Sequence, residues 1–272
     1  MKITIAILCS KDHLIKRCLA SIPSNVPIIV MLNNPDNYVE KAARQDKRVT
    51  VYRHDEPNLG LLRQLAAEYC KTEGILYVDS DCILMPYTVK YVENELNSYE
   101  AVSVPMRYGY NSMAAKIVSE CRKFTTPDEM LFIPAAFRIS IQDKIGGYLY
   151  DKRLTWGEDS DQRIRMRNAK IPFGISKGCV LHKSLTIKED AKSAYRLGKG
   201  TYIQVKYGVT KPRSLLRDMS IAKELQMARS CASKQGILAG LYHLLVWRVV
   251  YKYGYWKEII NGNRNRNHRK GL

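Results

Sequence analysis

Two aspartates, Asp79 and Asp81, stand one residue apart directly after the apolar run GILYV at residues 74–78. Carboxylates at this spacing can share one divalent cation, and oxygen ligands favour Mg²⁺ or Mn²⁺ over softer metals. A simple turn is the alternative, because Asp and Ser are common in turns and short acidic motifs arise by chance. The triplet alone leaves both interpretations open.

A second acidic group, in the segment WGEDSD at 156–161, contains Glu158 and Asp159. A carboxylate here could serve as a general base, but carboxylates are also favoured at helix N-termini by capping and by the helix dipole. His182 ends the apolar segment GCVLH. Imidazole suits Mn²⁺-type sites, although a lone histidine is more often structural.

The elements that must position these side chains alternate over the first hundred residues. Apolar runs predict strands at 2–9, 26–32, 48–53 and 74–78, and apolar residues at helical spacing mark 14–22 and 61–69. This alternation predicts right-handed βαβ units and a parallel sheet covered on both faces. Ligands of such sheets bind beyond the carboxyl ends of the strands, which is where the first acidic triplet falls.

Beyond residue 101 the pattern loosens. We expect shorter strands within 101–106 and 129–140, a helix at 160–167 and a closing strand within 171–182. After Lys211 the chain turns into long segments of helical character that are rich in Lys, Arg, Leu and Tyr.

Composition limits the function classes. The 272 residues hold 44 Lys and Arg against 26 Asp and Glu, which predicts an anionic partner: nucleic acid, an acidic membrane surface or a phosphorylated substrate. The seven cysteines never form a CxxC pair, which argues against a disulfide framework or a zinc site and favours reduced thiols. The first apolar run is too short for a signal peptide. We expect a cytoplasmic protein.

The order of these features forms one plan. An N-x-G motif follows the third strand, DSD the fourth, and a Gly-Gly loop, GEDSD, Arg165 and a strand ending in His182 come after them. The chain resembles the inverting glycosyltransferases of family 2 over roughly residues 2–183, most specifically in AAFRISIQDKIGGYLYDKRLTWGEDSDQRIRMR. The resemblance implies a GT-A fold: an α/β, Rossmann-like, mostly parallel sheet with helices on both faces, here with a C-terminal helical extension.

The resemblance also implies roles for the acidic residues. In the family, the strand-end DxD coordinates Mn²⁺ or Mg²⁺, which holds the diphosphate of a nucleotide-sugar donor; the matching positions are Asp79 and Asp81. His182 matches a position that supplies a further metal ligand in some members. Asp159 matches the general base, and Glu158 is expected to position the acceptor.

Nucleotide contacts in the family come from strand ends and from the start of the N-x-G helix. The corresponding residues here are Cys9, Ser10, Asn33, Asp55 or a neighbour, Asn58, Gly60, Arg63, Asp79 and Ser80. The second strand ends in MLNN, whereas the family usually has an acidic residue there that contacts the base. Asn33 would have to serve instead, since it offers a donor and an acceptor to a uracil edge. We expect a UDP-sugar donor and a glycan, lipid-linked or protein acceptor.

We predict a catalytic domain at 1–211, a basic helical extension at 212–260 and a disordered basic tail at 261–272. The extension could pack on the catalytic domain, lie on an anionic membrane with its aromatic and basic residues at headgroup level, or bind nucleic acid. The first two are favoured, which allows a peripheral position on the cytoplasmic face of a membrane.

Two other functions are alternatives. A sugar-1-phosphate nucleotidyltransferase needs a glycine-rich basic loop after the first strand, but the loop here, SKDHLIK, contains no glycine. A non-catalytic basic module that binds nucleic acid or membrane would make no use of Glu158, Asp159 or the DSD triplet.

Overall fold

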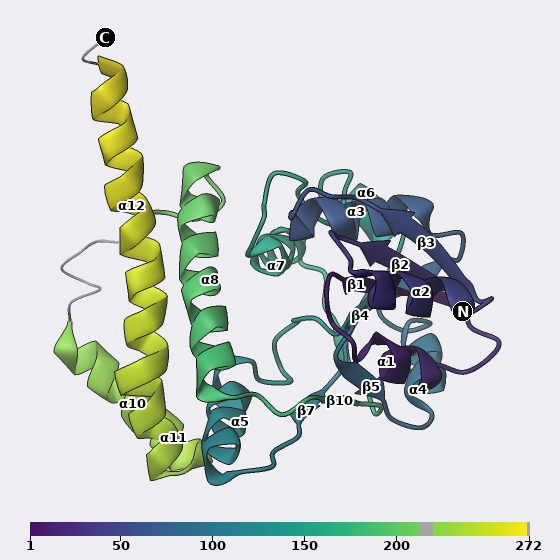
Figure 1. The fold of residues 1–272 in the computed structure, drawn as a ribbon, viewed down its shortest axis with the longest axis horizontal. Helices are drawn as coiled ribbons and strands as arrows, with labels where there is room; N and C mark the ends of the chain where they lie inside the picture. Colours follow the sequence, from purple (N-terminus) through teal and green to yellow (C-terminus); the bar gives the residue numbers. More distant parts are fainter. Residues whose placement is uncertain (213–219, 271–272) are drawn as a thin grey trace. The chain divides into compact units, whose positions relative to one another are not determined.

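The computed structural model describes residues 1–212 and 220–270, with side chains described as far as residue 261. The chain divides into two compact units. One, the sheet unit, comprises Met1–Tyr108 and Asp128–Lys183; the other, the helical unit, comprises Gly109–Pro127 and Ser184–Leu272. Figure 1 shows the elements of each unit.

The sheet unit is built on a seven-stranded sheet in the order β3-β2-β1-β4-β8-β6-β9. The first four strands in sequence pair in parallel, as expected, and β8 is antiparallel to both of its neighbours. Strands β1 and β2 are almost entirely buried, which is why they appear as unbroken apolar runs. The strands are β1 (Ile3–Cys9), β2 (Ile28–Leu32), β3 (Val49–Arg53), β4 (Gly74–Asp79), β6 (Ala101–Ser103), β8 (Ala135–Arg138) and β9 (Gly174–Ile175).

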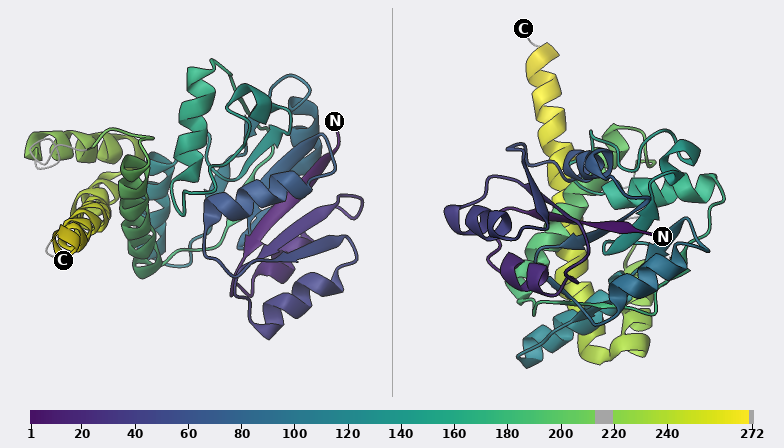
Figure 2. Two further views of the ribbon diagram at one scale, coloured as in Figure 1. Left: turned by 90° about the horizontal axis from the view of Figure 1, so that it is seen from above. Right: turned by 90° about the vertical axis from the view of Figure 1, so that its right-hand side faces the viewer.

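Helices cover both faces of this sheet, and each face has its own core (Figure 2). Three helices pack on one face: α1 (Ile15–Ala20), α2 (Asn37–Gln45) and α4 (Thr88–Glu95). Three pack on the other: α3 (Leu59–Tyr69), α6 (Ile141–Lys144) and α7 (Glu158–Asn168). The expected α/β fold, a mostly parallel sheet covered on both faces, is confirmed.

Three local expectations need correction. The polar segment after β2 was not assigned a helix but forms α2, whose first turn is capped by the Asp36 carboxylate accepting from the Val39 N–H at 2.9 Å. The apolar run at 129–140 forms only the four-residue β8. The closing strand within 171–182 is two strands, β9 in the main sheet and β10 (Val180–His182) in a second sheet.

That second sheet has three strands in the order β5-β10-β7, with β5 at Cys82–Leu84 and β7 at Met106–Tyr108. Strand β10 pairs antiparallel with β5, so that His182 lies opposite Cys82. This register brings the histidine next to the residue that directly follows Asp81. The small sheet is therefore the element that joins the DSD triplet to His182.

The helical unit has its own core and buried polar contacts. Arg122 forms a buried ion pair with Asp190, whose other oxygen accepts a hydrogen bond from the Tyr242 hydroxyl at 2.7 Å. Glycines at the crossing of α8 and α12 allow close approach, since a Cβ on Gly198 would collide with the Tyr251 carbonyl. The helices are α5 (Met113–Thr125), α8 (Ile187–Lys206), α10 (Ile221–Gln235), α11 (Ile237–Tyr242), the π-helix η1 (His243–Trp247) and α12 (Arg248–Lys270).

The domain boundary drawn at residue 211 and the tail at 261–272 stay predictions. The tail overlaps the end of α12, and its last two residues lie outside the described part of the chain. Within the described residues, no helix combines the length and the apolar character needed to cross a bilayer.

Candidate active site

The DSD triplet lies at the carboxyl end of β4, the central strand of the seven-stranded sheet. Its three side chains face different surroundings. Asp79 is 42% exposed and lies 3.8 Å from an Arg63 guanidinium nitrogen, whereas Ser80 is buried and donates to an Asp12 carboxylate oxygen at 3.3 Å. The Asp81 side chain is only 15% exposed. The edge of the sheet therefore gathers acidic side chains where ligands of this fold class bind.

Asp81 lies beside His182. The His182 Nε2 atom is 3.4 Å from an Asp81 oxygen, and its Nδ1 lies 2.9 Å from the Lys183 carbonyl oxygen. A proton on Nδ1, donated to that carbonyl, would leave the Nε2 lone pair for a cation shared with Asp81. Burial raises the pKa of Asp81, and a positive charge on protonated His182 opposes that rise.

Asp81, Cys82 and His182 form the one group of His, Cys, Asp and Glu ligand atoms in the described chain that gathers within 4.8 Å. The carboxylate and imidazole suit Mg²⁺ or Mn²⁺. The thiol does not, because sulfur is a soft ligand and these cations prefer oxygen. Asp79 stands outside this group and faces Arg63. Asp81 and His182 therefore fit a divalent cation better than Asp79 does.

Arg63 connects the triplet to the second acidic segment. Its guanidinium forms an ion pair with the Glu158 carboxylate, reaches Asp79 at 3.8 Å and lies 5.8 Å from the centre of the Tyr150 ring. Arg63 and Glu158 are both almost fully buried. Because a buried charge needs a partner, this pair holds the start of α7 against α3, beside the carboxyl end of β4.

Burial raises the pKa of Glu158 from 4.5 to about 7, despite the opposing charge of Arg63. Between these pH values, the folded chain therefore holds a proton that the unfolded chain has released, so stability falls as pH rises. We expect the free energy of unfolding of the wild type to fall relative to Glu158→Gln by at most ~1.4 kcal/mol per pH unit in this window. Urea denaturation from pH 4.5 to 8 measures it, with Glu93→Gln as control; parallel curves for wild type and Glu158→Gln would contradict it.

Asp159 lies in the first turn of α7, which begins after Gly157 in the left-handed conformation, φ +80°. Three acidic residues occupy that turn, as the positive end of a helix dipole favours. The Asp159 carboxylate accepts a hydrogen bond from the Ser160 N–H at 2.7 Å. Its other oxygen offers lone pairs for an acceptor hydroxyl, so a proton acceptor at this position is chemically sound.

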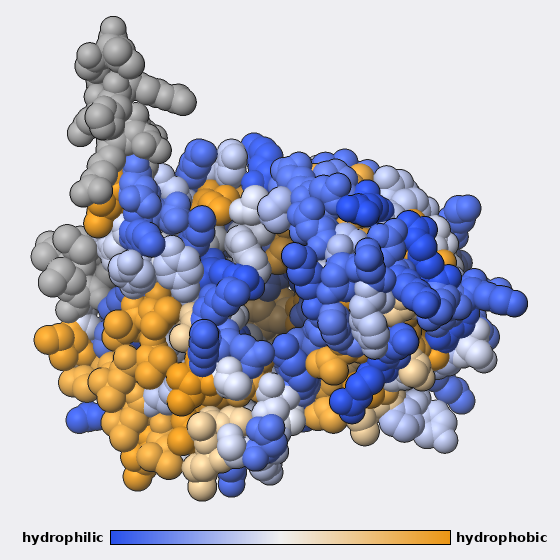
Figure 3. Space-filling model, in the orientation of Figure 1, coloured by the Kyte–Doolittle hydropathy of each residue, from blue (hydrophilic) through white to orange (hydrophobic). Residues whose placement is uncertain are grey.

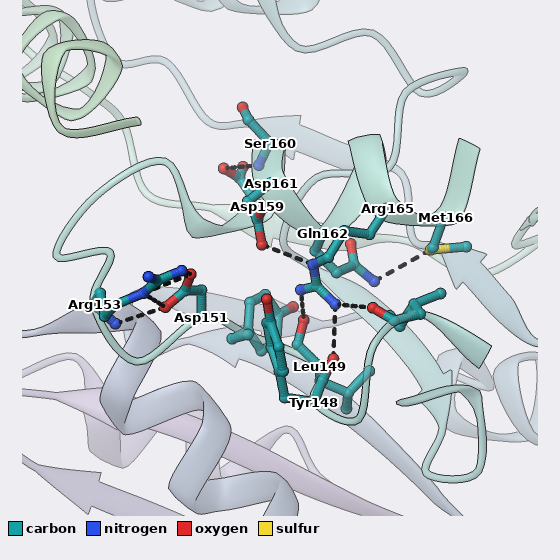
Figure 4. A network of polar contacts seen from close by, with 12 residues as sticks. Tyr148, Leu149, Asp151, Arg153, Asp159, Ser160, Asp161, Gln162, Arg165 and Met166 are labelled. Carbon is teal, nitrogen blue, oxygen red and sulfur yellow. Dashed lines mark hydrogen bonds and ion pairs between the residues drawn. The ribbon is translucent and has the colours of Figure 1, made fainter. Parts of the chain in front are cut away.

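Asp161 and Arg165 hold the loop in front of α7 (Figure 4). Asp161 binds the Arg165 guanidinium at 2.9 Å, and the same guanidinium donates to the carbonyls of Ile145, Tyr148 and Leu149 at 2.6 to 2.8 Å. Arg165 also lies over the Tyr148 ring. This clamp fixes the segment that leads to Asp151, whose two carboxylate oxygens both accept hydrogen bonds from Arg153.

The start of α3 forms hydrogen bonds with the same loop. Asn58 caps α3 by accepting from the Leu61 N–H at 3.0 Å, and its amide donates to the Lys152 carbonyl at 2.7 Å. The Gly60 N–H donates to the Leu154 carbonyl, and a Cβ on Gly60 would lie 2.6 Å from that oxygen. The N-x-G motif thus holds a close contact between helix and loop; its predicted contact with a nucleotide stays a prediction.

The ends of β1 and β2 supply the remaining predicted residues. Cys9 is buried at the end of β1, and Ser10 follows it exposed to solvent. Asn33 follows β2, and its amide nitrogen donates to the carbonyls of His54 and Glu56, both at 2.8 Å. Because both amide protons are used, Asn33 retains only its oxygen for a base, which suits the N3–H of uracil.

Two residues near the triplet were missed by the sequence analysis. Asp12, in the loop after β1, accepts from Ser80 and adds negative charge that raises the pKa of Asp81. Lys183 places its ammonium 3.7 Å from Asp81. Asp12 follows a parallel strand, a position that could have indicated a site residue, but the only feature of that loop used above is its lack of glycine. Nothing in the sequence marks Lys183 except that it follows His182.

Comparison with known sequences identifies a family. The sequence model of glycosyl transferase family 2 matches residues 9–186, which covers more than half of the chain and both acidic segments. No curated protein sequence matches the chain.

Solved structures of similar fold include those of S. aureus TarS. A structure of TarS residues 1–349 aligns with a TM-score of 0.51 and 13% identity, over all of this chain and 92% of that one. The same TarS fragment in complex with UDP-GlcNAc gives 0.52 and 11%, over 96% and 92%. A longer TarS structure gives 0.53 and 12%, over 93% of this chain and 55% of that one. At such identities the likeness shows the fold alone.

Proposed function

The chain belongs to glycosyl transferase family 2, and we propose that it is an inverting, metal-dependent enzyme that moves a sugar from a UDP-sugar to a hydroxyl acceptor. The observation that carries this proposal is the arrangement around Arg63. This one buried cation lies between Asp79, at the end of β4, and Glu158, at the start of α7. It places both acidic segments of the family motif at one edge of the sheet.

Asp81 and His182 would hold a divalent cation, with Asp79 closer to the donor. Such a cation would neutralise charge on the diphosphate as the glycosidic bond breaks. The chain's own residues do the rest: Asp159 accepts the proton of the acceptor hydroxyl, and Glu158, held by Arg63, supports the turn that presents it. The TarS complexes with UDP and UDP-GlcNAc, and the free oxygen of Asn33, support uridine as the base.

Nucleotide binding tests the donor and the metal together. We expect UDP with Mn²⁺ to stabilise the wild type by about 2.7 kcal/mol at a hundred times its dissociation constant, and to leave Asp81→Ala unchanged because the cation ligand is gone. Thermal unfolding with UDP, GDP, CMP and dTDP, each with and without Mn²⁺, measures this. Asp143→Ala, at an exposed position on α6, is the matched control. Equal stabilisation of Asp81→Ala would refute the metal site, and no stabilisation by any nucleotide would refute the donor.

The charge of the helical unit supports a second proposal, binding to an anionic membrane surface. Counted over the sequence, this unit holds 21 Lys and Arg against 6 Asp and Glu, whereas the sheet unit holds 23 against 20. Figure 3 shows an apolar surface in the lower left, over the region of α10 and α11. The exposed residues that follow one another from α11 through η1 into α12 are Ile237, Leu238, Leu241, Leu245 and Val249, each 49–73% exposed.

Apolar side chains beside an excess of cations are what an interfacial helix presents to anionic lipid. We expect the chain to sediment with vesicles that contain 30% phosphatidylglycerol and not with pure phosphatidylcholine. Leu245→Asp should weaken that binding several-fold, because it places a charge in the apolar surface. Ile175→Asp, a change at an exposed position on β9, should not. Equal binding to both vesicles, or equal effects of the two variants, would exclude this surface as a membrane contact.

A further inference from the structure

A cavity of about 670 Å³ lies against α7 in the sheet unit. Its other walls come from residues 129–131 and 170–173. Its volume falls within the range of small-molecule binding sites in proteins, roughly 300–1,000 Å³. None of the lining residues belongs to the Asp81–His182 group or to the predicted nucleotide contacts. The cavity is therefore a separate feature that the proposed donor site does not use.

The cavity joins two kinds of surface. Most lining side chains are apolar, among them Leu131, Ile164 and Phe173. Against them stand three cationic side chains, Arg163, Arg167 and Lys170, and one acidic one, Glu129. An apolar space with a net positive wall does not suit a sugar or a bare phosphate, because neither would fill the apolar part.

Arg163 is the cation whose surroundings are most specific. Its guanidinium lies 4.1 Å from the centre of the Phe132 ring, and its Nη2 donates to the Ser160 hydroxyl at 3.0 Å. Its Nη1 is buried and has no hydrogen-bond partner among the residues that the structure describes. Buried donors are nearly always satisfied in folded proteins, so a water molecule or a ligand is expected to supply an acceptor for this one.

Asp159 does not fill that need. It stands one helical turn before Arg163 and its charge favours the charged guanidinium, but the hydrogen bond of its carboxylate goes to the Ser160 N–H. Burial lowers the pKa of Arg163, a cost that a bound anion would offset. Along α7, the cavity lining thus begins at Ser160, the residue that directly follows the proposed base.

We propose that this cavity binds an amphipathic anion: a phosphate or carboxylate attached to an apolar chain. The acidic oxygens accept hydrogen bonds from Arg163, with Arg167 and Lys170 nearby, and the chain lies among the apolar walls. The site stands independently of the proposed sugar transfer, because it uses neither the nucleotide contacts nor the metal ligands.

Isothermal titration calorimetry of the full chain with octyl phosphate, kept below its critical micelle concentration, tests the proposal. Octyl phosphate should bind at one site at least tenfold more tightly than inorganic phosphate or octanol, which each supply half of the chemistry. Arg163→Met keeps the apolar stem and removes the donors, and should weaken binding roughly tenfold or more. Ile164→Trp should weaken it by filling the cavity. Lys90→Met, at an exposed position on α4, should bind as the wild type does.

The control arms separate this cavity from general attraction to the basic chain. If the wild type, Arg163→Met and Ile164→Trp bind octyl phosphate with equal affinity, the binding site lies elsewhere and the proposal is overturned. Equal affinities for octyl phosphate and for octanol or inorganic phosphate would overturn it as well. UDP binding measured on the same variants reports on the donor site, so failure of one proposal is distinguishable from failure of the other.

Discussion

Replacement of Asp159 by Asn is expected to lower the rate of sugar transfer at least 100-fold while leaving UDP affinity within twofold of the wild type. General-base catalysis contributes about 10² to 10⁴ in rate, and an amide of the same shape cannot accept the proton. The side chain lies in the first turn of α7, whose backbone the substitution preserves. Nucleotide binding should persist because the residues proposed for it lie on other elements.

The rate can be measured without knowledge of the acceptor. A transferase that hydrolyses its donor slowly uses water in place of the acceptor hydroxyl, so release of UDP from the UDP-sugar reports on the same base. Asp143→Asn on α6 is the matched control, since it removes one exposed carboxylate elsewhere in the sheet unit. If Asp159→Asn keeps more than a third of the wild-type rate and its UDP affinity is intact, Asp159 is not the general base.

Replacement of Arg63 by Met is expected to lower the free energy of unfolding by about 3–5 kcal/mol, because it leaves Glu158 buried without its cation. The loss should be smaller at pH 5 than at pH 8, since Glu158 can then take up a proton and become neutral. Addition of Glu158→Gln to the Arg63→Met variant should recover part of the loss. Urea denaturation of the four chains measures the coupling between the two residues.

A matched control distinguishes this pair from ordinary ion pairs. Arg44 binds Glu40 at 2.8 Å on the surface, where its side chain is 55% exposed, and Arg44→Met should cost less than about 1 kcal/mol. A similar cost for both Arg substitutions would mean that the Arg63–Glu158 pair does not hold α7 to the sheet. The predicted geometry of the donor site would then lose its main structural support.

The two proposals on Asp159 and Arg63 are linked through α7. Arg63 fixes the first turn of this helix, and the Asp161–Arg165 clamp fixes the loop before it. A chain that lost Arg63 but kept its fold at low pH would therefore be expected to transfer sugar slowly even with Asp159 present. The stability and rate measurements thus test the same geometry by independent readouts.

Several features followed from the sequence because they depend on local patterns. Buried parallel strands are continuous apolar runs, so β1, β2 and β4 were predicted close to their observed bounds. The short β3, which is only partly buried, was predicted as well. The sequence also shows that Asp79 and Asp81 come at the end of a parallel strand, and ligands of such sheets bind beyond the carboxyl ends of the strands. The order of motifs was sufficient for the family, which the match over residues 9–186 establishes.

Contacts between distant segments required the tertiary structure. Pairing of His182 with Cys82 depends on a sheet register across a hundred residues, and the sequence could not show that Asp81 would join His182 while Asp79 faces Arg63. The sequence also could not show that carbonyls of another loop accept both amide protons of Asn33. Periodicity and motif spacing encode how each segment folds on itself, whereas the partner of a buried charge or hydrogen-bonding group is chosen by packing. The sequence therefore determined the fold class and the family, and the tertiary structure decided which acidic side chains meet which cations.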